Sequence, residues 1–130
     1  MNFSIHVLCA PNRHQSSLSA LRFCQAALDR GHQIQRVFFS GDGVLTGNRL
    51  TAAPQGEPDW YAGWRLLARD HGVELVVCIS ASLRRGVLDA GEAGRYQKDG
   101  HNLAPEFILS GLGQLVEAGL ECDRLITFGA

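Results

Sequence analysis

The chain of 130 residues is long enough for one buried core, and we expect a single domain spanning 1–130. Its 12 Lys and Arg residues nearly balance its 13 Asp and Glu residues, so the charge does not indicate binding to nucleic acid or to an anionic membrane. No apolar run approaches the roughly 18 to 20 residues that a membrane helix needs, and the N-terminus lacks the basic region of a signal peptide. We therefore expect a cytoplasmic protein.

The first part of the chain predicts two strands and the helix between them. Apolar residues alternate over 3–9 and recur through 34–39, so both segments are expected to be strands. Between them, Ser16 or Ser17 is expected to cap the N-terminus of a helix that ends at Gly31.

The middle of the chain predicts a second helix and a buried strand. A connection rich in Gly, Thr and Pro covers 41–58, and Asp59 is expected to begin a helix that ends near Gly72. The next segment, 73–79, is almost entirely apolar, as strands buried on both faces of a parallel sheet tend to be.

The last part of the chain begins with a long connection. Weak helical character appears around 86–95, and 107–109 is expected to form a short strand. A third helix over 111–120 and a final strand over 124–128 complete the pattern. Because strands alternate with helices throughout, the sequence predicts an α/β fold with a mostly parallel sheet covered on both faces.

Loop lengths indicate which edge of this sheet carries function. Connections from helix to strand are short, whereas those that follow the second and third strands are long. In a parallel sheet all strand-to-helix loops meet at the carboxyl edge, where ligands and substrates of open α/β sheets bind. Cys78 lies at this edge.

Cys78 is therefore a candidate reactive thiol. A thiolate forms near neutral pH only when positive charge or helix N-terminal amides lie close to the sulfur. The small residues of 79–82 can begin a helical turn whose N–H groups face the sulfur, and Arg84 and Arg85 follow. Free cysteine is also among the most buried residue types, so simple packing in the core is the alternative interpretation.

The other three cysteines are irregularly spaced and form no Cys-x-x-Cys motif or Cys–His cluster, so we expect no metal site and no disulfide. Cys9 is a rival to Cys78, because it also ends a predicted strand at the same edge and is followed by Arg13 and His14. Cys24 lies on the apolar stripe of a predicted helix, and Cys122 lies in a helix-to-strand turn. We interpret these last two as structural.

Three further motifs carry weaker signals. Asp42 stands between two glycines and is interpreted as a turn residue rather than a catalytic carboxylate. The Gly-Leu-Gly at 111–113 lacks the third glycine and the later acidic residue of a dinucleotide site. Trp60 and Trp64 stand at helical spacing and are interpreted as core or interface residues.

Several ordered segments together resemble the DsrE/TusD family. The opening strand and helix fit this resemblance, so it spans essentially the whole chain. The segments that carry it are FF at 38–39, DGV at 42–44, RLT at 49–51, VVC at 76–78, LRRGV at 83–87, DAGEAGR at 89–95 and SGLGQLVEA at 110–118.

The resemblance implies a three-layer α/β/α fold around a mostly parallel five-stranded sheet, and a sulfurtransferase that carries sulfur as a persulfide on Cys78. Such subunits assemble with TusB-like and TusC-like paralogues into a heterohexamer. They take sulfur from a TusA-like donor and pass it to a TusE-like acceptor, toward 2-thiolation of the wobble uridine in certain tRNAs. No cofactor, metal, membrane or direct nucleic-acid contact is implied. Arg84 and Arg85 are possible stabilisers of the sulfur anion, or surface or interface charges.

Alternatives to this function remain at this point. A DsrE-like subunit would act with DsrF and DsrH in dissimilatory sulfur oxidation, and the stretch 95–107 does not separate it from the TusD-like alternative. A non-catalytic interaction subunit is an alternative of another class, although Cys78 speaks against it. A nucleotide- or flavin-binding module is disfavoured because no phosphate-binding loop is present.

Overall fold

Five parallel strands form one sheet in this computed structural model, which describes residues 1–129. Their order across the sheet is β4-β3-β2-β1-β5, and every neighbouring pair is parallel. The predicted fold class is therefore confirmed. The strands are β1 (Asn2–Val7), β2 (Gln33–Phe39), β3 (Glu74–Cys78), β4 (Phe107–Ser110) and β5 (Arg124–Phe128).

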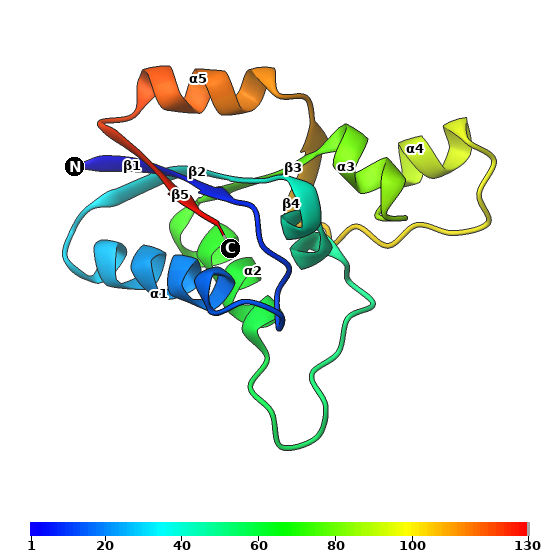
Figure 1. Cartoon of the computed structure of the whole chain (residues 1–130), viewed down its shortest axis with the longest axis horizontal. Coiled ribbons are helices and arrows are strands. Elements are labelled where there is room, and N and C mark those ends of the chain that lie inside the picture. The colour runs from blue at the N-terminus through cyan, green and yellow to red at the C-terminus, as the bar shows by residue number, and fades with distance from the viewer. Residues whose placement is uncertain (130) are drawn as a thin grey trace.

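Helices cover both faces of the sheet, with α5 alone on one face and α1 and α2 on the other (Figure 1). The long connections that follow β2 and β3 contain short helices, of which the sequence indicated only the helical turn after Cys78 and the weak helical character around 86–95. No helix in the described part of the chain is long and apolar enough to cross a membrane. The helices are α1 (Gln15–Asp29), η1 (Gly41–Gly47), α2 (Trp60–His71), α3 (Ile79–Arg84), α4 (Ala90–Arg95) and α5 (Gly113–Glu121).

Side chains of β2 alternate between these two helical layers. Phe39 packs edge-on against Trp64 of α2, with ring centroids 5.1 Å apart. Arg36, on the opposite face, donates from Nη1 to the carbonyl of Gln114 in α5 at 2.8 Å. Its Nε donates to Glu74 Oε2 of β3, also at 2.8 Å. These contacts show on which face of the sheet each residue of β2 and β3 lies, because successive side chains of a strand alternate between the two faces.

The ends of α2 agree with the caps expected from the sequence. Asp59 is the N-cap, and its side chain accepts a hydrogen bond from the backbone N–H of Ala62 at 3.1 Å. Gly72 adopts a left-handed conformation with φ of 66° directly after the helix, where a residue with a Cβ would be strained.

The start of α1 differs from the expectation. The N-cap is His14, so the prediction that Ser16 or Ser17 caps this helix is wrong. Ser16 instead donates its hydroxyl hydrogen to the carbonyl of Gly129 at 2.7 Å. Its hydroxyl therefore contacts the C-terminal end of the chain. Local capping rules could not predict this partner, because it lies far away along the sequence.

Candidate active site

Cys78 is the last residue of β3 and lies at the carboxyl edge of the sheet. It pairs in register with Ser110, the last residue of β4. Glu74 contacts Arg36 on the α5 side, and Cys78 lies four residues further along the same strand. The thiol is therefore on the α5 face of the sheet. Only 8% of the Cys78 surface is exposed.

The segment after Cys78 forms α3, and Cys78 is the N-cap of that helix. The predicted helical turn is thus confirmed, and the buried small residues Ala81 and Ser82 let it pack closely against η1 and the sheet edge. Cys78 makes no side-chain cap hydrogen bond, however. The backbone N–H groups of α3 are therefore not bonded to the sulfur, contrary to the contact expected from the sequence.

Arg85 is tied to the segment that follows β2. Its Nε lies 2.8 Å from Asp42 Oδ1 of η1, and its Nη1 donates to the carbonyl of Ala81 at 3.1 Å. Asp42, which the sequence indicated as a turn residue, is thus also an ion-pair partner that joins η1 to α3. Because the Arg85 charge is already paired, less of its electrostatic effect is available to a sulfur anion on Cys78.

Arg84 is exposed and differs from Arg85 in having no ion-pair partner among residues 1–129. It lines a surface cavity of about 310 Å³ together with Leu83, Leu88, Tyr96 and Lys98. The cavity has an apolar floor and two cationic side chains. Of the two arginines, Arg84 is therefore the one whose charge can act on a partner or on an anion.

Cys9 lies two residues beyond the end of β1, so the prediction that it ends this strand is wrong. It is 3% exposed, and its Sγ lies 3.4 Å from Ser16 Oγ. The same Ser16 hydroxyl donates to the carbonyl of Gly129. Cys9 is therefore enclosed by a contact between the start of α1 and the C-terminal end of the chain.

Cys24 and Cys122 have the surroundings expected of structural residues. Cys24 is fully buried in α1, and this burial raises its thiol pKa to about 12, against a smaller lowering by a backbone hydrogen bond. A thiol with that pKa is not ionised at neutral pH. Cys122 directly follows α5, at the amino edge of the sheet, where its Sγ lies 3.9 Å from the carbonyl of Gly119.

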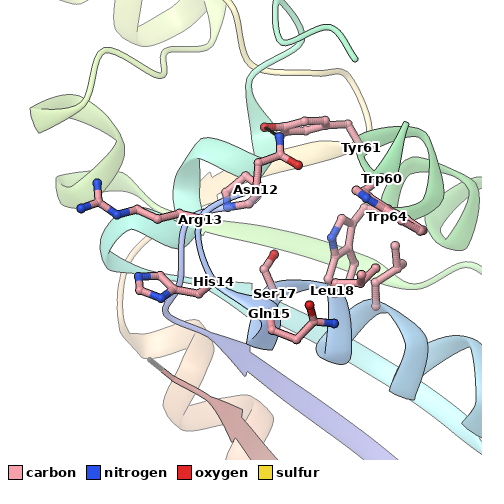
Figure 2. A pocket seen from close by; sticks show the side chains of 11 residues that line it. Asn12, Arg13, His14, Gln15, Ser17, Leu18, Trp60, Tyr61 and Trp64 are labelled. Atoms are coloured by element: carbon pink, nitrogen blue, oxygen red, sulfur yellow. Dashed lines mark hydrogen bonds between the residues drawn. The ribbon is translucent and has the colours of Figure 1, made fainter. Parts of the chain in front are cut away.

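A cleft of about 260 Å³ lies on the α1 and α2 side of the sheet, between the loop after β1 and the N-terminal end of α2 (Figure 2). Asn12 and Tyr61 meet at its rim, where Asn12 Nδ2 donates to the Tyr61 hydroxyl at 3.3 Å. Trp60 and Trp64 line one wall, and Trp64 continues into the core. Cys78 is not among the residues that line this cleft, so the candidate thiol does not open into it.

Three polar residues that the sequence analysis did not single out belong to the edge where Cys78 lies. Ser110 pairs with Cys78, and Ser40 directly follows β2. His6 of β1 places its Nε2 2.7 Å from Ser40 Oγ, and burial lowers the pKa of its imidazole. Only the register between strands places these residues near Cys78, and a single sequence does not provide that register.

The fold and the candidate site together define a parallel α/β protein with one buried cysteine at the carboxyl end of an inner strand. The chain belongs to the DsrE/DsrF-like family, whose sequence profile matches residues 1–128. The family membership expected from the sequence is thereby confirmed.

Several relatives match nearly the whole chain. The DsrE protein of Allochromatium vinosum is 47% identical over 129 residues, which cover 99% of each chain. The sulfurtransferase TusD of Klebsiella pneumoniae is 47% identical over 128 residues, which cover 98% of this chain and all of the relative. The TusD of Serratia proteamaculans is 52% identical over 114 residues, or 88% of each chain.

The fold is also similar to a solved structure. The crystal structure of the ychN protein of E. coli superposes with a TM-score of 0.75 and covers 98% of this chain and 100% of its own. Its sequence identity is 21%, so this likeness supports the fold alone.

Proposed function

We propose that this chain is a sulfurtransferase that carries sulfur as a persulfide on Cys78. The observation that carries the proposal is the place of Cys78 at the carboxyl end of an inner parallel strand, directly before α3. Enzymes with open parallel sheets bind their substrates at this edge. Relatives that match almost the entire chain are named sulfurtransferases, which supports the same activity.

The chemistry requires only cysteine side chains. The Cys78 thiolate attacks the terminal sulfur of a donor persulfide, a new S–S bond forms at Cys78, and the donor's S–S bond breaks to release the donor thiolate. In the second step the thiolate of an acceptor attacks the terminal sulfur on Cys78, and the Cys78 thiolate leaves. The sulfur moves between two thiols, the proton lost by the acceptor thiol returns to Cys78, and no net oxidation occurs.

The surroundings of Cys78 suit a carrier of reactive sulfur. With 8% of its surface exposed, the residue is shielded from small thiols in solution. We assign Arg84, which is exposed at the end of α3, to attracting anionic sulfur or an acidic partner, and Arg85 to holding α3 against η1 through Asp42.

A relay complex in the cytoplasm is the setting that we propose for this activity. In it the chain assembles with TusB-like and TusC-like paralogues, receives sulfur from a TusA-like donor and passes it to a TusE-like acceptor, toward tRNA wobble-uridine 2-thiolation. An apolar stripe on the outer face of α5 supports assembly with other chains, because Leu112, Val116 and Leu120 are 59%, 61% and 82% exposed.

A second candidate is the DsrE-like role in dissimilatory sulfur oxidation. The A. vinosum DsrE protein and a TusD relative each match this chain with 47% identity, over 129 and 128 residues, which favours neither role. The neighbouring genes distinguish the two roles, since genes for dissimilatory sulfite reductase would indicate the second.

Sulfur loading tests the proposal. The purified protein is incubated with a cysteine desulfurase, cysteine and a TusA-like donor, and the added sulfur is mapped by mass spectrometry. We expect one additional sulfur on Cys78 in the parent protein, none when the donor is omitted, and none in Cys78→Ser. If Cys78→Ser accepts sulfur as well as the parent does, another cysteine carries it and the proposal is wrong. If the parent accepts no sulfur, the chain is a non-catalytic interaction subunit.

A further inference from the structure

Three residues at the carboxyl ends of neighbouring strands lie side by side across the sheet. Cys78 pairs in register with Ser110 on one side. On the other side Phe39 pairs with Val77, so Ser40 is the next residue opposite Cys78. Ser40 keeps extended backbone angles and donates its N–H to the carbonyl of Val7 at 3.0 Å, so strand geometry continues through this residue.

Both serine side chains lie on the same face as the thiol. Ser40 follows Phe39, which packs against α2, so Ser40 is turned to the α5 side. Its hydrogen bond with His6 agrees, because the His6 ring packs edge-on against Phe38 on that side, with centroids 5.9 Å apart. Neighbouring strands are about 4.8 Å apart, so a hydroxyl group stands on each side of the sulfur.

Neither hydroxyl is hydrogen-bonded to the Cys78 thiol within the described part of the chain. A persulfide extends the side chain by one sulfur, about 2 Å beyond Sγ, and this terminal atom is the one that carries the negative charge. This inference rests on the proposed function. We propose that Ser40 and Ser110 donate hydrogen bonds to the terminal sulfur of a Cys78 persulfide, and that His6 positions Ser40 for this role.

His6 acts through Ser40 and does not touch the sulfur. As an Nε2–H tautomer, the imidazole donates to Ser40 Oγ and leaves the serine hydroxyl hydrogen to point at the persulfide. The lowered pKa of His6, which burial causes, agrees with a neutral ring that carries one ring proton. His6 is therefore a positioning residue.

Other charged groups near Cys78 are placed differently. The Asp42–Arg85 pair joins η1 to α3, and Arg84 is exposed on α3. On the sheet face, Arg36 and Glu74 pair with each other toward the opposite end of the strands. The two hydroxyls are thus the uncharged groups that flank Cys78 directly, and substitution of either one leaves these charges unchanged.

The experiment measures the pKa of the loaded persulfide. The protein carrying one sulfur on Cys78 is titrated with acid, and the near-ultraviolet absorbance of the persulfide anion reports its ionisation. Because hydrogen-bond donors favour the anion, Ser40→Ala and Ser110→Ala should each raise the persulfide pKa by about one unit, a tenfold change in its ionisation constant. Ser40→Thr and Ser110→Thr, which keep the hydroxyl, should restore the parent value.

The control variant is Ser80→Ala, because Ser80 is an exposed serine of α3. It should leave the persulfide pKa unchanged. His6→Phe should reproduce part of the Ser40→Ala shift and add nothing when combined with it, since the two residues act as one unit. His6→Gln, which keeps an N–H donor, should retain most of the parent value.

The outcomes separate this inference from the proposed function. If sulfur loads on Cys78 and neither serine variant moves the persulfide pKa, the hydroxyls do not bind the persulfide, and only the inference fails. If sulfur does not load on Cys78 at all, the proposed function fails first. Circular dichroism melting of each variant excludes misfolding as the cause of a shift.

Discussion

Cys9 and Cys78 both lie at the carboxyl edge of the parallel sheet, and both are buried, yet their surroundings differ. Cys78 ends its strand, pairs with Ser110 and begins a helix. Cys9 lies beyond its strand and contacts Ser16, which is itself bonded to the C-terminal end of the chain. A position at the carboxyl edge is therefore not enough to make a thiol a candidate for transfer. What differs is the bonding of the nearby hydroxyls: Ser16 donates its hydrogen to the carbonyl of Gly129, whereas neither Ser40 nor Ser110 donates its hydroxyl to a carbonyl in the described part of the chain.

Alanine substitution of Cys78 and of Cys9 should give the largest difference in sulfur acceptance between two variants. Cys78→Ala should reduce sulfur acceptance by at least about 100-fold, because no other thiol is placed to become the nucleophile. Cys9→Ala should keep sulfur acceptance and lower the free energy of unfolding by about 1 kcal/mol through lost packing. Sulfur loading and urea denaturation of both variants measure the two effects. Loading lost in Cys9→Ala but kept in Cys78→Ala would reverse the comparison.

Gly43 affects the surroundings of both cysteines at once. A Cβ there would overlap the carbonyl oxygen of Val7 and would lie 3.6 Å from the carbonyl oxygen of Cys9. Gly43→Ala should therefore push η1 away from β1 and lower the free energy of unfolding by about 2–4 kcal/mol. Because η1 also packs on α3, alkylation by iodoacetamide should become faster at both Cys9 and Cys78. Gly94→Ala, where a Cβ would meet nothing within 4 Å, is the matched control.

Separate substitution of Arg84 and Arg85 should distinguish an electrostatic role from a structural one. Arg84→Ala should slow sulfur acceptance by about threefold and weaken its dependence on salt, with melting temperature unchanged, since an exposed charge acts mainly on association. Arg85→Ala breaks the partly exposed ion pair with Asp42 and should cost up to about 1 kcal/mol of stability. Equal loss of sulfur acceptance in both variants, at every salt concentration, would contradict this division of roles.

The smallest expected effect is a pH dependence at the Cys78 edge. Burial lowers the pKa of His6 below its ordinary value of 6.5, so the unfolded chain binds the proton more readily than the folded one. Stability should therefore fall as pH decreases from 6.5 through the lowered pKa, and this part of the dependence should disappear in His6→Phe. Urea denaturation between neutral and mildly acidic pH measures it, with His32→Phe as the control at an imidazole next to the N-terminal amine.

Local sequence patterns predicted the elements and the edge of the sheet where Cys78 lies. The apolar run ending at Cys78 and the cap at Asp59 are local signals, and both agree with the structure. The hydrogen bond from Ser16 to Gly129 and the ion pair of Arg85 with Asp42 join segments distant along the chain, and no local pattern encodes them. Ser40 was missed for the same reason, because its place beside Cys78 depends on strand register.

Burial of Cys78 has a consequence for the order of events in a relay. A small reductant such as glutathione and the cysteine of a partner protein compete for the same sulfur, and in solution the reductant is far more abundant. If Cys78 carries the sulfur as proposed, its 8% exposure favours the partner, because a docked protein can supply the contacts needed to uncover the sulfur. We therefore expect the onward transfer rate to saturate with partner concentration, while discharge by small thiols stays slow. Transfer is then selective for the partner protein, because the partner docks before the sulfur becomes exposed.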